Sequence, residues 1–245
     1  MAKAKSKKPV KKVAHASLRQ VLMRWFKRLV FIALLILISP YLLILLYKFD
    51  FVHPPSTLMI GELLTGRSYE RQWVDIDDVA PVLVQSVMMS EDGQFCAHSG
   101  VDWDALNIVI SEALEGEASR GASTLAMQVS KNLFLLPVRS AIRKALEIPL
   151  ALFSDYVWGK KRMMELYLNI AEWGHGIYGI EAASQAYFGK SAKTLTRRQA
   201  ALLTVTLPNP IVRNPLKPSK GMSRLARKVE ARAKQSGAYI KCIYP

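Results

Sequence analysis

The pattern of hydrophobic and polar positions divides the chain into one long apolar run and a series of amphipathic segments. Residues 29–47 contain no charge and lie between Lys27-Arg28 and Lys48. At about 1.5 Å per residue, a helix over this run covers roughly the 30 Å of a bilayer core. The run is longer than the apolar core of a signal peptide, so it predicts an uncleaved transmembrane anchor, which Pro40 would kink. A buried core helix is the alternative.

After the anchor, most segments have helical periodicity. Residues 57–69 alternate and predict a short strand or an extended arm within a juxtamembrane connector, residues 48–74. Gly159 is expected to separate two helices, Asp102 to cap one, and Thr196 with Gln199 to form a capping box. Apolar spacing predicts helices over about 79–90, 102–114, 123–134, 139–158, 160–169, 181–188, 196–203 and 223–235. The chain is therefore expected to be mainly α-helical.

Charge supports the membrane interpretation. The net charge is +15, and residues 1–28 contain ten lysines and arginines and no acid. We expect this basic tail to be disordered. The positive-inside rule places it in the cytoplasm and residues 49–245 on the other side of the membrane. A basic tail can bind nucleic acid, but its position beside the anchor argues against nucleic acid as a partner.

The chain has two cysteines, Cys96 and Cys242. They form no disulfide framework and no spacing typical of metal ligands. We expect two unpaired, partly buried thiols, with a single disulfide as the alternative.

The first candidate for chemistry is Glu91-Asp92, which follows the apolar run 82–89. A carboxyl group pressed against apolar surface acquires a raised pKa, which suits a general acid or base at neutral pH. A solvated surface turn is the alternative for such a pair. The polar loop over 115–121 is a candidate for a mobile lip over a groove.

A second group of candidates is basic and rich in hydroxyls. Thr124, Gln128 and Lys131 stand at i, i+4 and i+7, so they share one face of a helix, and a hydroxyl near its start suits a phosphate. Arg143 and Glu147 stand at i and i+4 on an otherwise apolar helix, which suggests that they face a cleft. The alternatives are an ordinary solvated face and a surface ion pair. Together the chain offers a carboxylate base, a patch suited to phosphate, a second acid and a membrane anchor. This combination suits an enzyme that transfers a group from a membrane-bound lipid phosphate.

Five ordered runs of residues stand out between about residues 75 and 215. They are Glu91-Asp92-x2-Phe95-x2-His98-x-Gly100-x-Asp102, Arg120-Gly121-Ala122-Ser123-Thr124-x3-Gln128-x2-Lys131-Asn132, Arg143-Lys144-x2-Glu147, Lys161-x3-Glu165-x-Tyr167-Leu168-Asn169 and Gly176-x-Tyr178-Gly179-x3-Ala183-x3-Tyr187-Phe188-x-Lys190. Together these runs resemble the motifs of the peptidoglycan glycosyltransferases of family 51, in their monofunctional, membrane-anchored form. The family pattern usually has Gly at position 122 and often Gln at 127, where this chain has Ala122 and Met127.

The resemblance implies a mainly α, lysozyme-like glycosyltransferase domain with a small membrane-proximal jaw, over residues 75–218, and a basic C-terminal tail over 219–245. It implies polymerisation of lipid II into β-1,4-linked glycan, with inversion and release of undecaprenyl pyrophosphate. Glu91 matches the general base and Glu147 the second catalytic acid. The substrate-binding residues implied are Asp92, Ser123, Thr124, Gln128, Lys131, Asn132 and Arg143, although Asp92 and His98 are expected to hold the motif in shape.

The resemblance also implies the setting of the enzyme. The catalytic domain is expected in the periplasm of a bacterium, anchored once in the inner membrane, with lipid II and the growing strand as partners. Penicillin-binding transpeptidases are candidate partners, but this chain contains no Ser-x-x-Lys and no Lys-Thr-Gly of its own. A Mg²⁺ or Mn²⁺ ion on the pyrophosphate is compatible with the reaction, although no dedicated metal site is visible. A glycan-cleaving lytic enzyme and a non-enzymatic envelope scaffold are the alternative functions.

Overall fold

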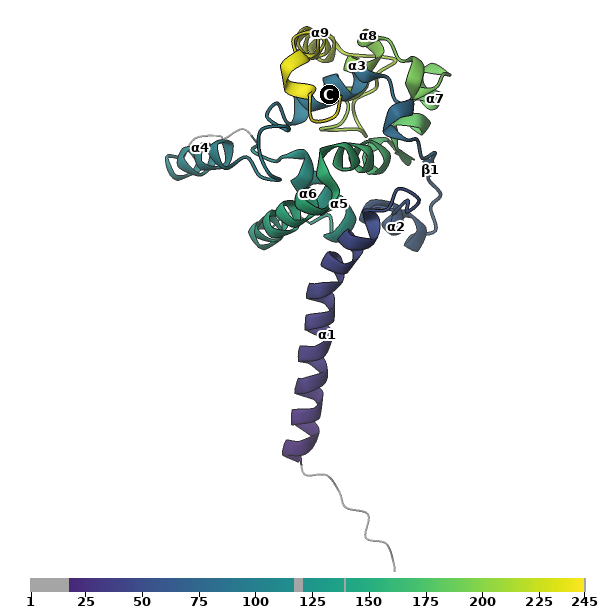
Figure 1. Ribbon diagram of the computed structural model, residues 1–245. Helices are drawn as coiled ribbons and strands as arrows, with labels where there is room; N and C mark the ends of the chain where they lie inside the picture. Colours follow the sequence, from purple (N-terminus) through teal and green to yellow (C-terminus); the bar gives the residue numbers. More distant parts are fainter. Residues whose placement is uncertain (1–17, 117–120, 139, 245) are drawn as a thin grey trace, which may run out of the picture. The chain divides into compact units, whose positions relative to one another are not determined.

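A computed structural model describes residues 18–116, 121–138 and 140–244 and divides after Pro40 into two compact units (Figure 1). Most of these residues are helical, as predicted. The predicted disorder of the first 17 residues, the centre of the predicted lip at 117–120, and Arg139 lie outside the described residues.

Helix α1 (Leu18–Tyr47) contains the predicted anchor and begins upstream of it, so the expected disorder is wrong for residues 18–28, which continue the helix of the anchor. The most apolar 18 residues within Arg19–Tyr47 have a mean hydropathy of 3.0, and this stretch is long and apolar enough to cross a membrane. The helix passes through Pro40, which has no N–H to offer the carbonyl of Ile36. The Ser39 hydroxyl donates to that carbonyl instead, at 3.1 Å. A polar side chain thus restores the hydrogen bond that the proline removes.

The second unit is built of helices with one small sheet. The elements of this unit are α2 (Thr57–Leu64), β1 (Glu70–Arg71), η1 (Ile76–Asp78), α3 (Pro81–Glu91), α4 (Trp103–Leu114), α5 (Leu125–Phe134), α6 (Ala141–Ile170), β2 (Glu172–Gly174), β3 (Ile177–Tyr178), α7 (Ile180–Phe188), η2 (Ala192–Thr194), α8 (Arg197–Thr204), α9 (Lys220–Lys234) and η3 (Gly237–Ile240). The strand order in the sheet is β1-β3-β2, with β1 parallel and β2 antiparallel to β3.

Several local predictions are confirmed. Asp102 caps α4 by accepting from Ala105 N, and Thr196 with Gln199 form the capping box of α8. Gly159 has φ +68° and interrupts α6 between the two helices that the sequence predicted. Most helix bounds differ from the predicted ones by only a few residues.

The predicted strand over residues 57–69 is wrong. Residues 57–64 form helix α2, because Ser56 caps it by accepting from Met59 N. The Thr57 hydroxyl then donates to the carbonyls of Asn132 and Leu135, which fastens α2 to the end of α5. The short alternating pattern was ambiguous, and the cap decides for helix.

A long-range clasp joins the end of α1 to α6. Arg162 donates to the carbonyls of Tyr47, Phe49 and Val52 at 2.7–3.1 Å and pairs with Glu165. The last carbonyls of a helix have no partner within it, so a guanidinium with several donors is suited to this position. Residues 41–52 therefore belong to the second compact unit.

The C-terminal segment is also part of this unit. Helix α9 packs against α3 and α8 and buries Met222, Ala226, Val229 and Ala233 along one face. Cys242 forms a disulfide with Cys96, with the two Cα atoms 5.5 Å apart and a sequence separation of 146. The expectation of two unpaired thiols is therefore wrong. Only the folded chain brings these cysteines together, and their spacing in sequence gives no sign of it.

Candidate active site

Glu91 is the last residue of α3, at the edge of a cavity. Its carboxylate accepts long hydrogen bonds of 3.4 Å from Gln128 Nε2 and from Ser90 Oγ. Burial raises the pKa of Glu91, and these two donors and the charge of Arg213 oppose the rise. The raised pKa was the sequence expectation, and it suits a group that takes up a proton near neutral pH.

Tyr167 sets the orientation of the amide that faces Glu91. The fully buried phenol donates to Gln128 Oε1 at 3.3 Å, which turns the amide nitrogen toward the carboxylate. Burial and the charge of Glu91 raise the pKa of Tyr167 well above its usual value, so the phenol remains a donor. The sequence placed Tyr167 in a family motif, but nothing local to it indicated this contact.

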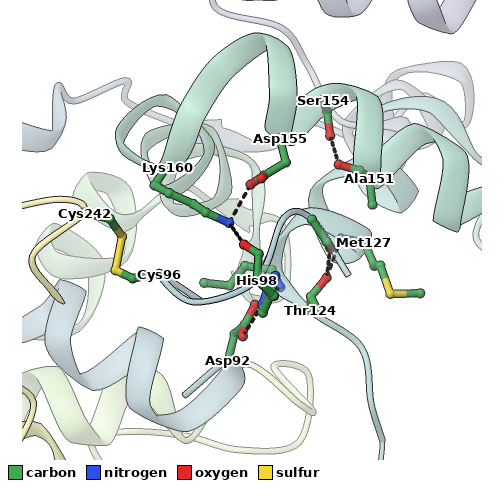
Figure 2. A network of polar contacts seen from close by, with 12 residues as sticks. Asp92, Cys96, His98, Thr124, Met127, Ala151, Ser154, Asp155, Lys160 and Cys242 are labelled. Atoms are coloured by element: carbon green, nitrogen blue, oxygen red, sulfur yellow. Dashed lines mark hydrogen bonds and ion pairs between the residues drawn. A yellow bond between two sulfur atoms is a disulfide. The ribbon is translucent and has the colours of Figure 1, made fainter. Parts of the chain in front are cut away.

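Asp92 faces inward and connects three elements around the site. One carboxylate oxygen lies 2.9 Å from His98 Nε2, and the other accepts from Leu125 N at the start of α5 (Figure 2). Both the charge and the position suit a helix N-terminus. Asp92 and His98 therefore hold the motif in shape, as expected, and Asp92 uses both oxygens in doing so.

Thr124 also makes internal contacts. It caps α5 by accepting from Met127 N, and its hydroxyl donates to Gly100 O at 2.6 Å (Figure 2). A side chain on Gly100 would meet the carbonyl oxygen of Ala151 at 2.6 Å, and its φ of +77° also favours glycine. The glycine lets the motif loop lie directly on α6.

The cavity at Glu91 has a volume of about 430 Å³. The sequence-predicted residues Asp92, Ser123 and Thr124 contribute to its wall together with Glu91. Two further wall residues, Arg232 and Tyr239, come from the C-terminal segment that the sequence assigned to a tail. Their place in the wall depends on tertiary packing, so the local sequence around them gives no indication of it.

Lys131, Asn132 and Arg143 line a separate cavity of about 220 Å³ near the C-terminal end of α5. Burial lowers the pKa of Lys131, and the nearby charges of Glu147 and Glu91 oppose this. Within the described residues its ammonium group makes no hydrogen bond or ion pair. A half-buried cation with free donors is suited to bind an anion that enters from outside.

Glu147 is buried at 1% exposure and is neutralised by two cations. Its carboxylate pairs with Arg143 and with Lys144 Nζ, the latter at 3.2 Å. The same ammonium group donates to Ser123 Oγ at 3.3 Å, which links this cluster to the wall of the first cavity. The motif resemblance implied no role for Lys144, whereas the structure shows that it links Glu147 to Ser123.

The arrangement therefore offers a carboxyl base that contacts Gln128 of α5 and, three residues further along the same helix, a half-buried lysine whose ammonium group has no hydrogen bond or ion pair within the described residues. Such a pair can deprotonate a hydroxyl and stabilise an anionic leaving group. Within residues 18–116, 121–138 and 140–244, no three His, Cys, Asp or Glu side chains gather in a way that could hold a metal ion.

Comparison with known proteins agrees with these observations. Residues 57–235 match the sequence model of the family described as Transglycosylase. The chain is 61% identical over 218 residues to a biosynthetic peptidoglycan transglycosylase of Rhizobium meliloti (strain 1021), covering 89% of this chain and 92% of the relative. Proteins of the same description from Agrobacterium fabrum (57% identity, 89% and 96%) and Brucella suis biovar 1 (58%, 86% and 95%) are also similar.

Proposed function

The chain belongs to the transglycosylase family, and on that premise we propose that it is a peptidoglycan glycosyltransferase that polymerises lipid II. The observation that carries the proposal is the presence beside helix α5 of both a carboxyl group of raised pKa and a half-buried lysine that has no hydrogen bond or ion pair within the described residues. The reaction needs both, because it activates a sugar hydroxyl and expels a lipid pyrophosphate.

Glu91 is the general base in this mechanism. Its carboxylate takes the proton from the 4-hydroxyl of an acceptor lipid II, while the hydroxyl oxygen attacks the anomeric carbon of the lipid-linked glycan. The bond from that carbon to the pyrophosphate oxygen breaks, and undecaprenyl pyrophosphate leaves with the bonding electrons. Attack from the opposite face inverts the anomeric centre and gives a β-1,4 linkage.

Lys131, Arg143 and Asn132 bind the pyrophosphate and stabilise the charge that develops as it leaves. Glu147 keeps Arg143 and Lys144 in position, and in this arrangement it acts through these cations rather than as a free acid. Gln128 orients Glu91, and Ser123 lies where it can contact a sugar or phosphate. Asp92 and Thr124 keep the wall of the cavity in place.

Any Mg²⁺ or Mn²⁺ that the reaction uses would be bound by the pyrophosphate of the substrate. The described residues provide no cluster of ligands for a resident ion, so no step is assigned to one.

The enzyme is proposed to be anchored in the bacterial inner membrane by α1, with residues 49–245 in the periplasm. The basic flank of the anchor supports this orientation. The Cys96–Cys242 disulfide supports it independently, because such bonds persist in the oxidising periplasm and are rare in the cytosol. The product strand needs cross-linking, so penicillin-binding transpeptidases are the proposed partner class.

The test is lipid II polymerisation by the purified full-length protein in detergent, with glycan products separated on a gel. We expect ladders of increasing length and release of undecaprenyl pyrophosphate. Cleavage of preformed glycan without any ladder would indicate a lytic enzyme instead. A folded protein with neither activity would indicate a scaffold.

A further inference from the structure

The C-terminal segment reaches the cavity that contains Glu91. Arg232, in the last turn of α9, and Tyr239, in η3, line this cavity together with residues of α3 and of the segment before α5. Both side chains are exposed rather than buried in the core, and Tyr239 retains 47% of its accessible surface. They therefore face the space that a substrate of Glu91 would enter.

This segment is held rigidly in place. Helix α9 is fixed by its buried face against α3 and α8, and Ile240 and Ile243 belong to the main hydrophobic core. The disulfide to Cys96 fastens the following turn to the loop directly after Glu91 (Figure 2). A wall that is fixed at both ends can position a ligand at a low cost in conformational entropy.

Tyr239 belongs to η3, and Cys242 follows it by three residues. Tyr239 and Cys96 line one small cavity together with Gly93, Gln94 and Ala97. The Tyr239 ring therefore lies beside the loop that follows Glu91, close to the point where the disulfide joins the two segments.

Arg232 has no internal partner. Within the described residues its guanidinium forms no ion pair or hydrogen bond, whereas Lys234 in the same turn lies 3.9 Å from Glu230. A guanidinium offers five donors in a planar fork that fits phosphate and carboxylate groups. Its free donors at the Glu91 cavity are suited to an anionic group of a substrate.

We propose that the C-terminal segment is the acceptor-side wall of the active site, with Arg232 binding an anionic group of the acceptor lipid II and Tyr239 packing against one of its sugar rings. The Cys96–Cys242 disulfide holds this wall against the loop that carries Glu91. This inference rests on the proposed function, because it assigns the acceptor to the Glu91 cavity and leaves the pyrophosphate donor to the Lys131 side.

The decisive experiment compares Arg232→Ala with Arg227→Ala, which removes the same charge from an exposed position of the same helix. Preformed lipid-linked glycan is supplied as a saturating donor, and lipid II is titrated as the acceptor. We expect Arg232→Ala to raise the KM for lipid II about tenfold, as for one lost charge-assisted hydrogen bond, with kcat within twofold of wild type. Arg227→Ala should behave as wild type.

Two further variants test the rest of the wall. Tyr239→Ala should raise the same KM about threefold to tenfold, and Tyr239→Phe should retain wild-type behaviour because the ring rather than the hydroxyl is used. The double variant Cys96→Ser, Cys242→Ser should also raise the KM for lipid II, because the C-terminal segment is then no longer covalently fixed to the loop after Glu91. Thermal unfolding of each variant separates these effects from a loss of folding, and Arg232→Ala, at an exposed position, should unfold at the wild-type temperature.

A second acceptor identifies the anion. Lipid II contains pyrophosphate and also the carboxylates of its pentapeptide, so the titration is repeated with lipid II whose peptide carboxylates are amidated. If the tenfold difference between Arg232→Ala and wild type disappears, Arg232 binds a carboxylate, and if it persists, Arg232 binds the pyrophosphate. Equal KM values for Arg232→Ala, Arg227→Ala and wild type would overturn the inference, provided that wild type polymerises. A wild type that does not polymerise would instead overturn the proposed function.

Discussion

Glu91 and Glu147 are both carboxylates in a largely apolar setting, but their surroundings differ. Glu91 accepts two long hydrogen bonds from neutral groups, and burial raises its pKa. Glu147 is more deeply buried, yet Arg143 and Lys144 neutralise it directly. The first carboxyl group is therefore suited to take up a proton, and the second is engaged in ion pairs that hold two cations in position. Two acids in one site can have different roles because their partners differ.

The largest effect is expected from Glu91→Gln. The amide cannot accept a proton, so polymerisation should fall by about 10²–10⁴-fold, the usual contribution of a general base. Initial rates on lipid II measure this, with the exposed Glu115→Gln as the control. Near-wild-type turnover in a folded Glu91→Gln protein would remove Glu91 from the mechanism.

Lys131→Ala should have the next largest effect. Loss of an ammonium group that faces the leaving pyrophosphate should weaken binding of a phosphoglycolipid such as moenomycin by roughly tenfold to a hundredfold. The measurement is a direct binding titration, with the exposed Lys228→Ala as a control of equal charge. Unchanged affinity would contradict the assignment of the phosphate site.

Glu147→Gln tests whether the second acid acts through its cations. Removing one member of a buried charge cluster leaves the others uncompensated, but Arg143 and Lys144 are partly exposed and can be rehydrated. We therefore expect a loss of about 1–3 kcal/mol in the free energy of unfolding, together with weaker moenomycin binding. If activity is lost while stability and moenomycin binding remain as in wild type, Glu147 takes part in the chemistry directly.

Tyr167→Phe should have a smaller effect, visible mainly in the pH profile. The hydrogen bond that the Gln128 amide donates to Glu91 lowers the pKa of this carboxyl group. Without the Tyr167 phenol the amide is less well oriented, so the pKa of Glu91 should rise. Activity requires ionised Glu91, so the acidic limb of kcat/KM should move to higher pH, with a loss of only a few-fold at the optimum. An unchanged acidic limb would show that Tyr167 does not orient the base.

The smallest expected effect is on the stability of Glu91→Gln, which should increase although the activity of this variant falls. The folded-state pKa of Glu91 is raised, so the stability that its protonated form contributes is lost as pH rises through that pKa. Glu91→Gln stays neutral and should unfold at a higher temperature than wild type at pH 7, by about 2–4 °C if the gain is near 1 kcal/mol. The gain should be present at pH 7 and should vanish below about pH 4, where the carboxyl group is protonated in the unfolded chain as well.

Local signals predicted much of the fold and of the site. Helix caps such as Asp102 and Thr196 are determined within four residues of the chain, and the polar stripe of Gln128 and Lys131 follows from helical spacing alone. The motif resemblance placed Glu91 and Glu147 beside these residues. Such features depend on neighbours in sequence, so they can be predicted without the fold.

The features that escaped prediction depend on distant contacts. The pairing of Cys96 with Cys242, the wall formed by Arg232 and Tyr239, and the inward contacts of Thr124 all join segments that the sequence separates. The prediction for residues 57–64 was wrong for a different reason. A short apolar pattern fits both a strand and a helix, and here the N-cap Ser56 favours the helix. Tertiary contacts supplied what local propensity left open.

If the catalytic unit is exported as proposed, the sequence separation of 146 between the two cysteines also sets an order of events. Cys96 then crosses the membrane well before Cys242, with nearly the whole catalytic unit between them, so the bond forms late in export. If the acceptor wall also needs that bond, a chain that is still leaving the translocation channel cannot yet start a glycan strand.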